Sequence, residues 1–162
     1  MKTAVVYYSF EGSCAFAART IKGILESAPF KGKADLYEIK TVDAKKRTGF
    51  SKYLWGGSQV LMRKKPALAP LEFDPAPYDL IILGTPVWAA SPAPAMVSFL
   101  DRHDLRGKKT ALFCCHAGGK GRALEKFRAL VPGAVISGEI DLRGPVQADI
   151  TGRLGDWLRN LG

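Results

Sequence analysis

Residues 3–25 read TAVVYYSFEGSCAFAARTIKGIL, and this stretch indicates the fold. Apolar and β-branched residues fill Thr3–Ser9, which predicts a strand that is buried on both faces of its sheet. From Ser13 to Ser27 the apolar residues recur with a helical period. A buried strand that leads through a short turn into a helix is typical of the first unit of an α/β fold.

The rest of the chain repeats this alternation. Further strands are predicted at residues 34–39, 78–83, 110–115 and 134–142, and further helices at 94–100, 122–131 and 148–161. Five strands alternating with helices in 162 residues predict one doubly wound, three-layer α/β domain over residues 1–162, with a five-stranded parallel sheet. The least regular stretch, about 41–77, is interpreted as a basic, insert-like segment with a short helix at Phe50–Met62.

The charge of the chain is uneven. Its net charge is +9, although the hydrophobic and charged fractions, 47% and 24%, are ordinary for a soluble globular protein. Between Lys40 and Lys65 eight Lys and Arg stand against one Asp. This excess predicts attraction to an anionic partner, and a solvated loop or helix face explains it equally well.

Cysteine usage indicates the compartment. Cys14, Cys114 and Cys115 are odd in number and two of them are adjacent, which does not suit a disulfide framework and indicates a reducing, cytoplasmic setting. No CxxC or His/Cys spacing typical of a zinc site occurs. No signal peptide is expected, and the uncharged stretch Leu80–Leu100 contains prolines that predict a strand, a turn and a helix rather than a membrane span.

Three loops rich in Gly, Ser or Pro follow predicted strands: SFEGSC (9–14), GTPVWAASPAP (84–94) and HAGGKG (116–121). Loops that follow parallel strands share one edge of the sheet, where ligands of open α/β sheets bind, so we expect one ligand site there. The N–H groups of a helix N-terminus and a tight turn at Gly12 suit a phosphate. Simple helix capping by Ser13 explains the first loop equally well.

Spacing argues against several phosphate-handling classes. The GxxxxGK[ST] of P-loop proteins is absent, and no GxGxxG follows the first strand. A cysteine phosphatase places Arg six residues after its Cys, where this chain has Thr20, Lys120 and Gly121. A phospho-acceptor receiver domain needs acidic residues where Tyr8 and Gly84 stand.

The other two loops suit a flat ligand. Trp88 follows the stiff Pro86 and could flank an aromatic ring, although covering the end of the sheet is the commoner role for such a residue. Gly118 and Gly119 let the backbone approach a ligand closely, and a flexible helix start is the simpler explanation of them.

These segments resemble flavodoxin-like proteins. A strand that ends in YS, then xxGS and a helix, resembles their phosphate loop. The segments LGTPVWAASPAPAMVSFL, ALFCCHAGGKGRALEKF and YLWGGSQVLMRKKPAL resemble the second loop, the third loop and an insert of the short-chain bacterial and archaeal branch. The resemblance covers nearly the whole chain, and TPVW is its most specific part. It implies a flavodoxin-like fold with strand order 2-1-3-4-5 and non-covalent binding of flavin mononucleotide (FMN).

The resemblance also implies three groups of cofactor-binding residues. The first group surrounds the phosphate: Ser9, Phe10, Glu11, Gly12, Ser13 and Cys14. The second lines the ribityl chain and the ring: Thr85, Pro86, Val87, Trp88 and Ala89. The third closes the far side of the ring: Cys115, His116, Ala117, Gly118 and Gly119. No metal ligand and no catalytic residue is implied.

The chain departs from the family at two points, a pair of residues in the first loop and the net charge. Ser13-Cys14 stands where the family usually has Asn-Thr, and Cys14, interpreted as a substituted phosphate ligand, is a weak donor. Losing one charge-assisted hydrogen bond of about 1.5–3 kcal/mol weakens binding about ten- to a hundredfold. The carboxylate of Glu11 would repel a phosphate and is expected to turn outward. The net charge of +9 also contrasts with acidic flavodoxins.

The function expected is that of an FMN-binding redox protein, either an oxidoreductase or an electron-transfer protein. His116 is the candidate to hydrogen-bond or protonate the reduced flavin, and a solvent-exposed histidine at a helix start is the simpler explanation of it. NAD(P)H or an acidic redox protein are the expected partners, and homodimerisation is left open. The alternative function is a flavodoxin-fold binding module that holds FMN weakly or not at all. Its basic segment, residues 40–65, would bind an acidic protein or, less favoured, nucleic acid.

Overall fold

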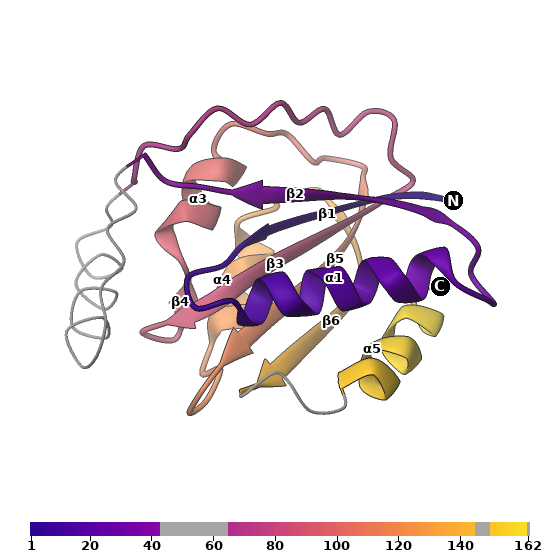
Figure 1. Ribbon diagram of the computed structural model, residues 1–162. Helices are drawn as coiled ribbons and strands as arrows, with labels where there is room; N and C mark the ends of the chain where they lie inside the picture. The colour runs from indigo at the N-terminus through magenta and orange to yellow at the C-terminus, as the bar shows by residue number, and fades with distance from the viewer. Residues whose placement is uncertain (43–64, 145–149, 162) are drawn as a thin grey trace.

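The computed structural model describes residues 1–42, 65–144 and 150–161 (Figure 1). Five strands form a parallel sheet in the order β2-β1-β3-β5-β6. Their bounds are β1 Lys2–Tyr8, β2 Lys33–Ile39, β3 Leu80–Trp88, β5 Lys109–His116 and β6 Val135–Arg143. The short β4 (Ser91–Pro92) stands off this path, so the predicted order 2-1-3-4-5 is confirmed. The helix expected at Phe50–Met62 lies outside the described residues.

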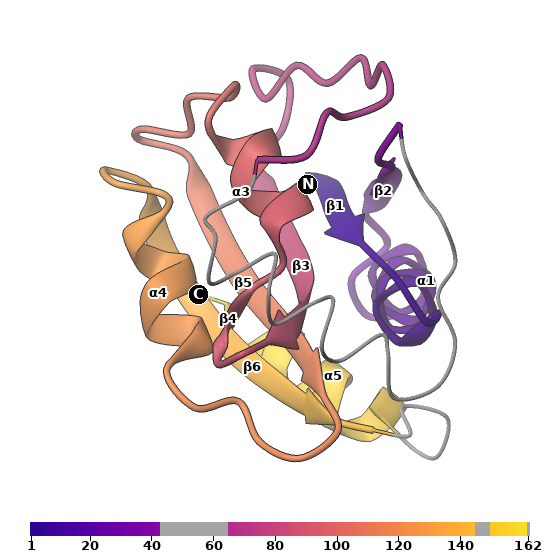
Figure 2. The same ribbon diagram turned by 90° about the vertical axis from the view of Figure 1, so that its left-hand side faces the viewer.

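Helices cover both faces of the sheet. The helices α1 (Ser13–Glu26) and α5 (Ile150–Arg159) lie on one face, and α3 (Pro94–Leu100) and α4 (Ala123–Ala129) lie on the other (Figures 1 and 2). Successive residues of β1 divide between the two layers: Val5 packs on the side of α1 and Val6 on the side of α3. The predicted burial on both faces is therefore confirmed for β1, whereas the edge strands β2 and β6 are for the most part only half-buried. In the described ranges no helix is long and apolar enough to cross a membrane.

The third long strand extends further than predicted. It does not end at Leu83 but continues to Trp88, and its last residues pair with β4 through Val87–Pro92 and Trp88–Ser91. The prediction of an irregular loop over residues 84–94 is therefore wrong for its first part. In the described sheet β1 pairs with β3 only as far as Gly84, so Pro86 lies where its missing N–H is tolerated.

The β3–β4 hairpin turns at two alanines with left-handed backbone. Ala89 has φ +47° and Ala90 has φ +53°, a conformation that normally selects Gly or Asn. The turn lies against the loop that follows β5, because a Cβ built on Gly121 would lie 2.7 Å from the Cβ of Ala90. Gly121 itself has φ +49°. A glycine is therefore needed at this contact for two reasons, space and backbone conformation.

The connector between β2 and β3 is anchored at both ends. Thr41 forms an antiparallel bridge with Leu68, and the N–H of Val42 donates to the carbonyl of Ala67 at 3.0 Å. These bonds hold the two flanks of residues 43–64 next to each other, just past the carboxyl end of β2. Further along, the ring of Phe73 packs 5.0 Å from that of Tyr37 and fixes the connector to the sheet.

Gly84 permits the closest contact in the core. A Cβ at this position would lie 1.9 Å from the ring of Phe113 on the neighbouring strand β5. We expect Gly84→Ala to lower the free energy of unfolding by at least about 2 kcal/mol, because an overpacked core must shift its backbone. Gly23→Ala in α1 is the control; its Cβ would meet nothing within 4 Å, so a gain of about 0.5–1 kcal/mol is expected. Urea unfolding measures both, and equal stabilities would contradict the contact.

The strained hairpin turn makes a second prediction. Gly121→Ala should lower the free energy of unfolding by about 1–3 kcal/mol, because it adds a clash with Ala90 and a strained φ. Ala89→Gly should raise the free energy of unfolding by up to about 1 kcal/mol, because glycine adopts positive φ without a steric penalty. Thermal unfolding of the two variants measures both changes, and the reverse order would show that the turn is not strained.

Candidate functional site

The loops after β1, β3 and β5 meet at the carboxyl edge of the sheet, which faces the viewer in Figure 2. Phe10 of the first loop and Trp88 at the end of β3 contact each other edge to face, with ring centroids 5.6 Å apart. The turn of the β3–β4 hairpin also lies against Gly121 of the third loop. The prediction that these three loops share one edge is therefore confirmed.

The first loop is shaped by Ser9. Its Oγ accepts hydrogen bonds from the N–H groups of Gly12 and Ala15, each at 3.2 Å. Gly12, with φ +99°, occupies the N-cap position of α1. Because it has no side chain, it makes no side-chain hydrogen bond to the first N–H groups of the helix. Capping of the helix by Ser13, the alternative explanation of this loop, is not observed; Ser9 holds the loop from inside instead.

This arrangement presents backbone N–H groups at the start of α1. The first N–H groups of a helix have no partner within the helix and carry partial positive charge. Ser9 and Gly12 occupy those of Ala15 and Phe16, whereas those of Ser13 and Cys14 form no hydrogen bond with the described residues. Glu11 is exposed, in keeping with its expected outward orientation. The turn can therefore offer two N–H donors to an anion.

The thiol of Cys14 does not lie in the loop. Cys14 is only 1% exposed, and its thiol packs in the core and hydrogen-bonds to Cys115. Burial, followed by the bond to Cys115, raises the pKa of the Cys14 thiol well above its usual value. The interpretation of this thiol as a substituted phosphate ligand is therefore corrected: Cys14 brings only its backbone N–H to the loop. Burial also raises the pKa of Cys114 to about 12, so that thiol is inert as well.

Trp88 is held in place by two other rings. It contacts Tyr8 at 5.9 Å and Phe10 at 5.6 Å, with interplanar angles of 82° and 89°. Such edge-to-face contacts fix the orientation of a half-buried indole, which suits stacking on a flat ligand.

The other predicted residues of the second loop take different places. Thr85 is fully buried, and its hydroxyl accepts the N–H of Ala93 at 3.0 Å at the start of α3, so its side chain positions the loop. Pro86 and Val87 are half-buried beside Trp88, and Ala89 is exposed at the hairpin turn.

The third loop combines open glycines with a buried histidine. Ala117, Gly118 and Gly119 are exposed, and a Cβ on either glycine would meet no atom of the described structure within 4 Å. The His116 side chain is only 7% exposed, so the expectation of a solvent-exposed histidine is wrong. Its Nε2 lies 3.0 Å from Oδ2 of Asp141 on β6.

Asp141 was not among the residues predicted from the sequence. It lies 25 positions after His116 in the chain, and the parallel pairing of β5 and β6 brings the two together. The signal that could have found it is a carboxylate inside the otherwise apolar run Ile140–Leu142 of a predicted strand. In the described ranges no group of three or more His, Cys, Asp or Glu could hold a metal ion.

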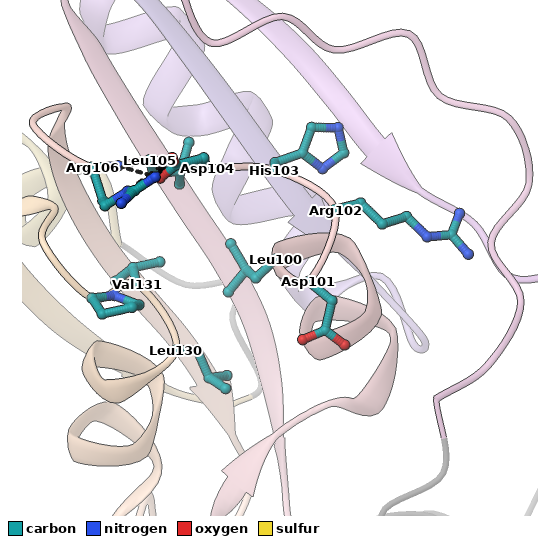
Figure 3. A pocket seen from close by; sticks show the side chains of 10 residues that line it. Leu100, Asp101, Arg102, His103, Asp104, Leu105, Arg106, Leu130 and Val131 are labelled. Atoms are coloured by element: carbon teal, nitrogen blue, oxygen red, sulfur yellow. Dashed lines mark hydrogen bonds and ion pairs between the residues drawn. The ribbon is translucent and has the colours of Figure 1, made fainter.

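A hollow of about 480 Å³ lies at the opposite edge of the sheet (Figure 3). It is lined by residues 100–106 and 130–132, between the ends of α3 and α4 and the strands that follow them. Its charged side chains are already paired: Asp104 with Arg106 at 2.7 Å and Asp101 with Lys65 at 2.6 Å. Arg102 points away from the hollow. We therefore assign this hollow no role.

Comparison with known proteins identifies the family. The family model described as Flavodoxin matches residues 2–161. The fold is similar to that of a flavoprotein from Lactobacillus acidophilus NCFM, solved in complex with FMN: 24% identity over 97% of this chain and 98% of that one, with TM-score 0.71. It is also similar to the two-electron reduced flavodoxin of Megasphaera elsdenii: 19% identity over 95% and 96% of the two chains, with TM-score 0.60.

A flavodoxin from the domain Archaea is a third similar structure, with 18% identity over 99% of both chains and TM-score 0.60. No curated protein matches the chain. These structural likenesses agree with the strand order and the loop arrangement described above. Because the family model spans the sequence from Lys2 to Leu161, the chain belongs to the flavodoxin family.

Proposed function

We propose that this protein binds FMN non-covalently and transfers electrons through it. The observation that carries the proposal is the meeting, at one sheet edge, of an N–H-rich turn and a tryptophan fixed by two neighbouring rings. Membership of the flavodoxin family supports the proposal, as does the FMN in the Lactobacillus acidophilus relative.

The residues at this edge fit FMN. A phosphate dianion needs hydrogen-bond donors, and the turn offers the N–H groups of Ser13 and Cys14 at the positive end of α1. A flat ring needs an aromatic neighbour and space, which Trp88 and the open positions at Gly118 and Gly119 supply. The buried thiols of Cys14 and Cys114 are unsuited to a covalent link, which agrees with non-covalent binding.

The side chains of the site bind and orient rather than react. When bound, the flavin supplies the chemistry of accepting and releasing electrons, and the protein sets its position and surroundings. Ser9 and Gly12 keep the phosphate turn in shape, and Tyr8 and Phe10 keep Trp88 in one orientation. Restraining the loops before the ligand arrives reduces the entropy lost on binding.

The excess positive charge suggests the kind of partner. A net charge of +9 raises the local concentration of anionic molecules, and both an acidic redox protein and NAD(P)H fit this requirement. Most of the basic segment, residues 43–64, lies outside the described residues. The alternative function, a binding module without flavin, predicts that neither FMN nor riboflavin binds.

Ser9 tests the phosphate end of the site. Ser9→Ala should weaken FMN binding about tenfold, because two N–H groups lose the acceptor that holds them in the turn. Riboflavin has no phosphate, so its affinity should stay within about twofold of the wild-type value. Ser27→Ala, at the other end of α1, is the matched control. Titration of flavin fluorescence measures all affinities. If Ser9→Ala weakened the binding of FMN and riboflavin equally, the phosphate would not bind at this turn.

Trp88 tests the ring end. Trp88→Leu should weaken FMN and riboflavin alike by about tenfold or more and reduce the quenching of flavin fluorescence, because stacking on the indole is lost. Trp157→Phe in α5, which packs against Gly138 on the far layer, serves as the control. Unchanged quenching in Trp88→Leu would show that the ring does not lie beside Trp88.

A further inference from the structure

A chain of three polar side chains lies under the loop that follows β5. His116 Nε2 lies 3.0 Å from Oδ2 of Asp141, and Oδ1 of Asp141 lies 2.5 Å from Nζ of Lys120. Lys120 belongs to the loop itself, so these three side chains connect the loop, the end of β5 and the edge strand β6. The other ring nitrogen of His116, Nδ1, is buried and makes no hydrogen bond with the described residues.

The carboxylate decides which ring nitrogen carries the proton. Hydrogen bonds from Lys120 and then from His116 lower the pKa of Asp141, so its carboxylate stays ionised and only accepts. His116 therefore donates through Nε2–H, and in the neutral ring Nδ1 is left as an acceptor. A buried acceptor without a partner costs about 1–3 kcal/mol, which indicates a site built for a donor that comes from elsewhere.

Two other charged side chains near these three, Glu139 and Arg153, have hydrogen-bond partners of their own. On β6, Glu139 pairs with Arg128 at 2.7 Å, and Arg143 lies opposite His116 in the strand register. From α5, Arg153 donates to the backbone carbonyl of Asp141 at 3.1 Å. Among the described residues, Asp141 is therefore the carboxylate that fixes the ring of His116.

We propose that Asp141 and Lys120 are positioning residues that hold His116 in one tautomer, so that its Nδ1 accepts an N–H group of the flavin ring. This inference rests on the proposed function. Nδ1 is buried, so the flavin ring reaches it only when the atoms that cover it move. The loop has open space around Gly118 and Gly119, and Lys120 ties it to β6. In this proposal, the three side chains provide a defined hydrogen-bond acceptor at the ring end of the site, away from the phosphate.

Nitrogen-15 NMR of the imidazole tests the tautomer directly. In the wild type, His116 should be in the Nε2–H form, and adding riboflavin should move the Nδ1 resonance in the direction of a newly accepted hydrogen bond. Asp141→Asn should produce a mixture of tautomers, because the charge that selects one is gone. Glu139→Gln, a carboxylate-to-amide change on the same strand, should leave the spectrum unchanged.

Affinities for flavin complete the test. Asp141→Asn and His116→Phe should weaken riboflavin and FMN equally, by about three- to tenfold, and His116→Gln, which keeps an acceptor, should restore part of the loss. Circular dichroism and thermal unfolding confirm that the variants fold. Wild-type protein that binds flavin while Asp141→Asn changes neither the tautomer nor the affinity would overturn this inference and leave the proposed function standing. Wild-type protein that binds no flavin would overturn both.

Discussion

Parallel strands can be joined only by connections that cross back over the sheet, and this constraint determines where the site lies. Because each strand of the main sheet runs in the same direction, the loops that follow β1, β3 and β5 all emerge at one edge. Helices must cover both faces, so the strands need apolar side chains on both sides, as β1 shows. The edge is then the one region where backbone N–H groups and polar side chains can face a ligand.

The loops at this edge are held by polar side chains that bond to their own backbone. Ser9 holds the turn before α1, Thr85 holds the start of α3, and Lys126 of α4 reaches Ser91 of the hairpin at 2.7 Å. Each of these bonds restrains a loop backbone, which reduces the entropy that the loop would lose on binding a ligand. The left-handed alanines of the hairpin turn fit the same picture, since backbone strain persists only where surrounding contacts enforce it.

Most of the fold could be predicted because the strands are continuous apolar runs and their order follows from the resemblance. The end of β3 could not, because Gly84-Thr85-Pro86 has the composition of a turn, and only pairing with β4 and β5 makes it a strand. The positions of the three loops were predictable from chain order, but the roles of their side chains were not. Cys14 faces the core and His116 is buried against Asp141, and both facts depend on strand register and on packing between distant segments.

The positive charge of the protein is concentrated in one segment. Six of the 24 Lys and Arg lie in residues 43–64 against one Asp, so more than half of the net charge of +9 belongs to a segment whose flanks the structure joins at Thr41 and Leu68. Thr41 follows the carboxyl end of β2, at the same edge as the phosphate turn of the proposed flavin site. In the described regions many cations are paired with a carboxylate, as Lys120, Arg122 and Arg128 are, and such pairs contribute little net field. A concentration of positive charge in one segment favours association with anions, and the two partners proposed above, a phosphate-bearing cofactor and an acidic protein, are both anionic.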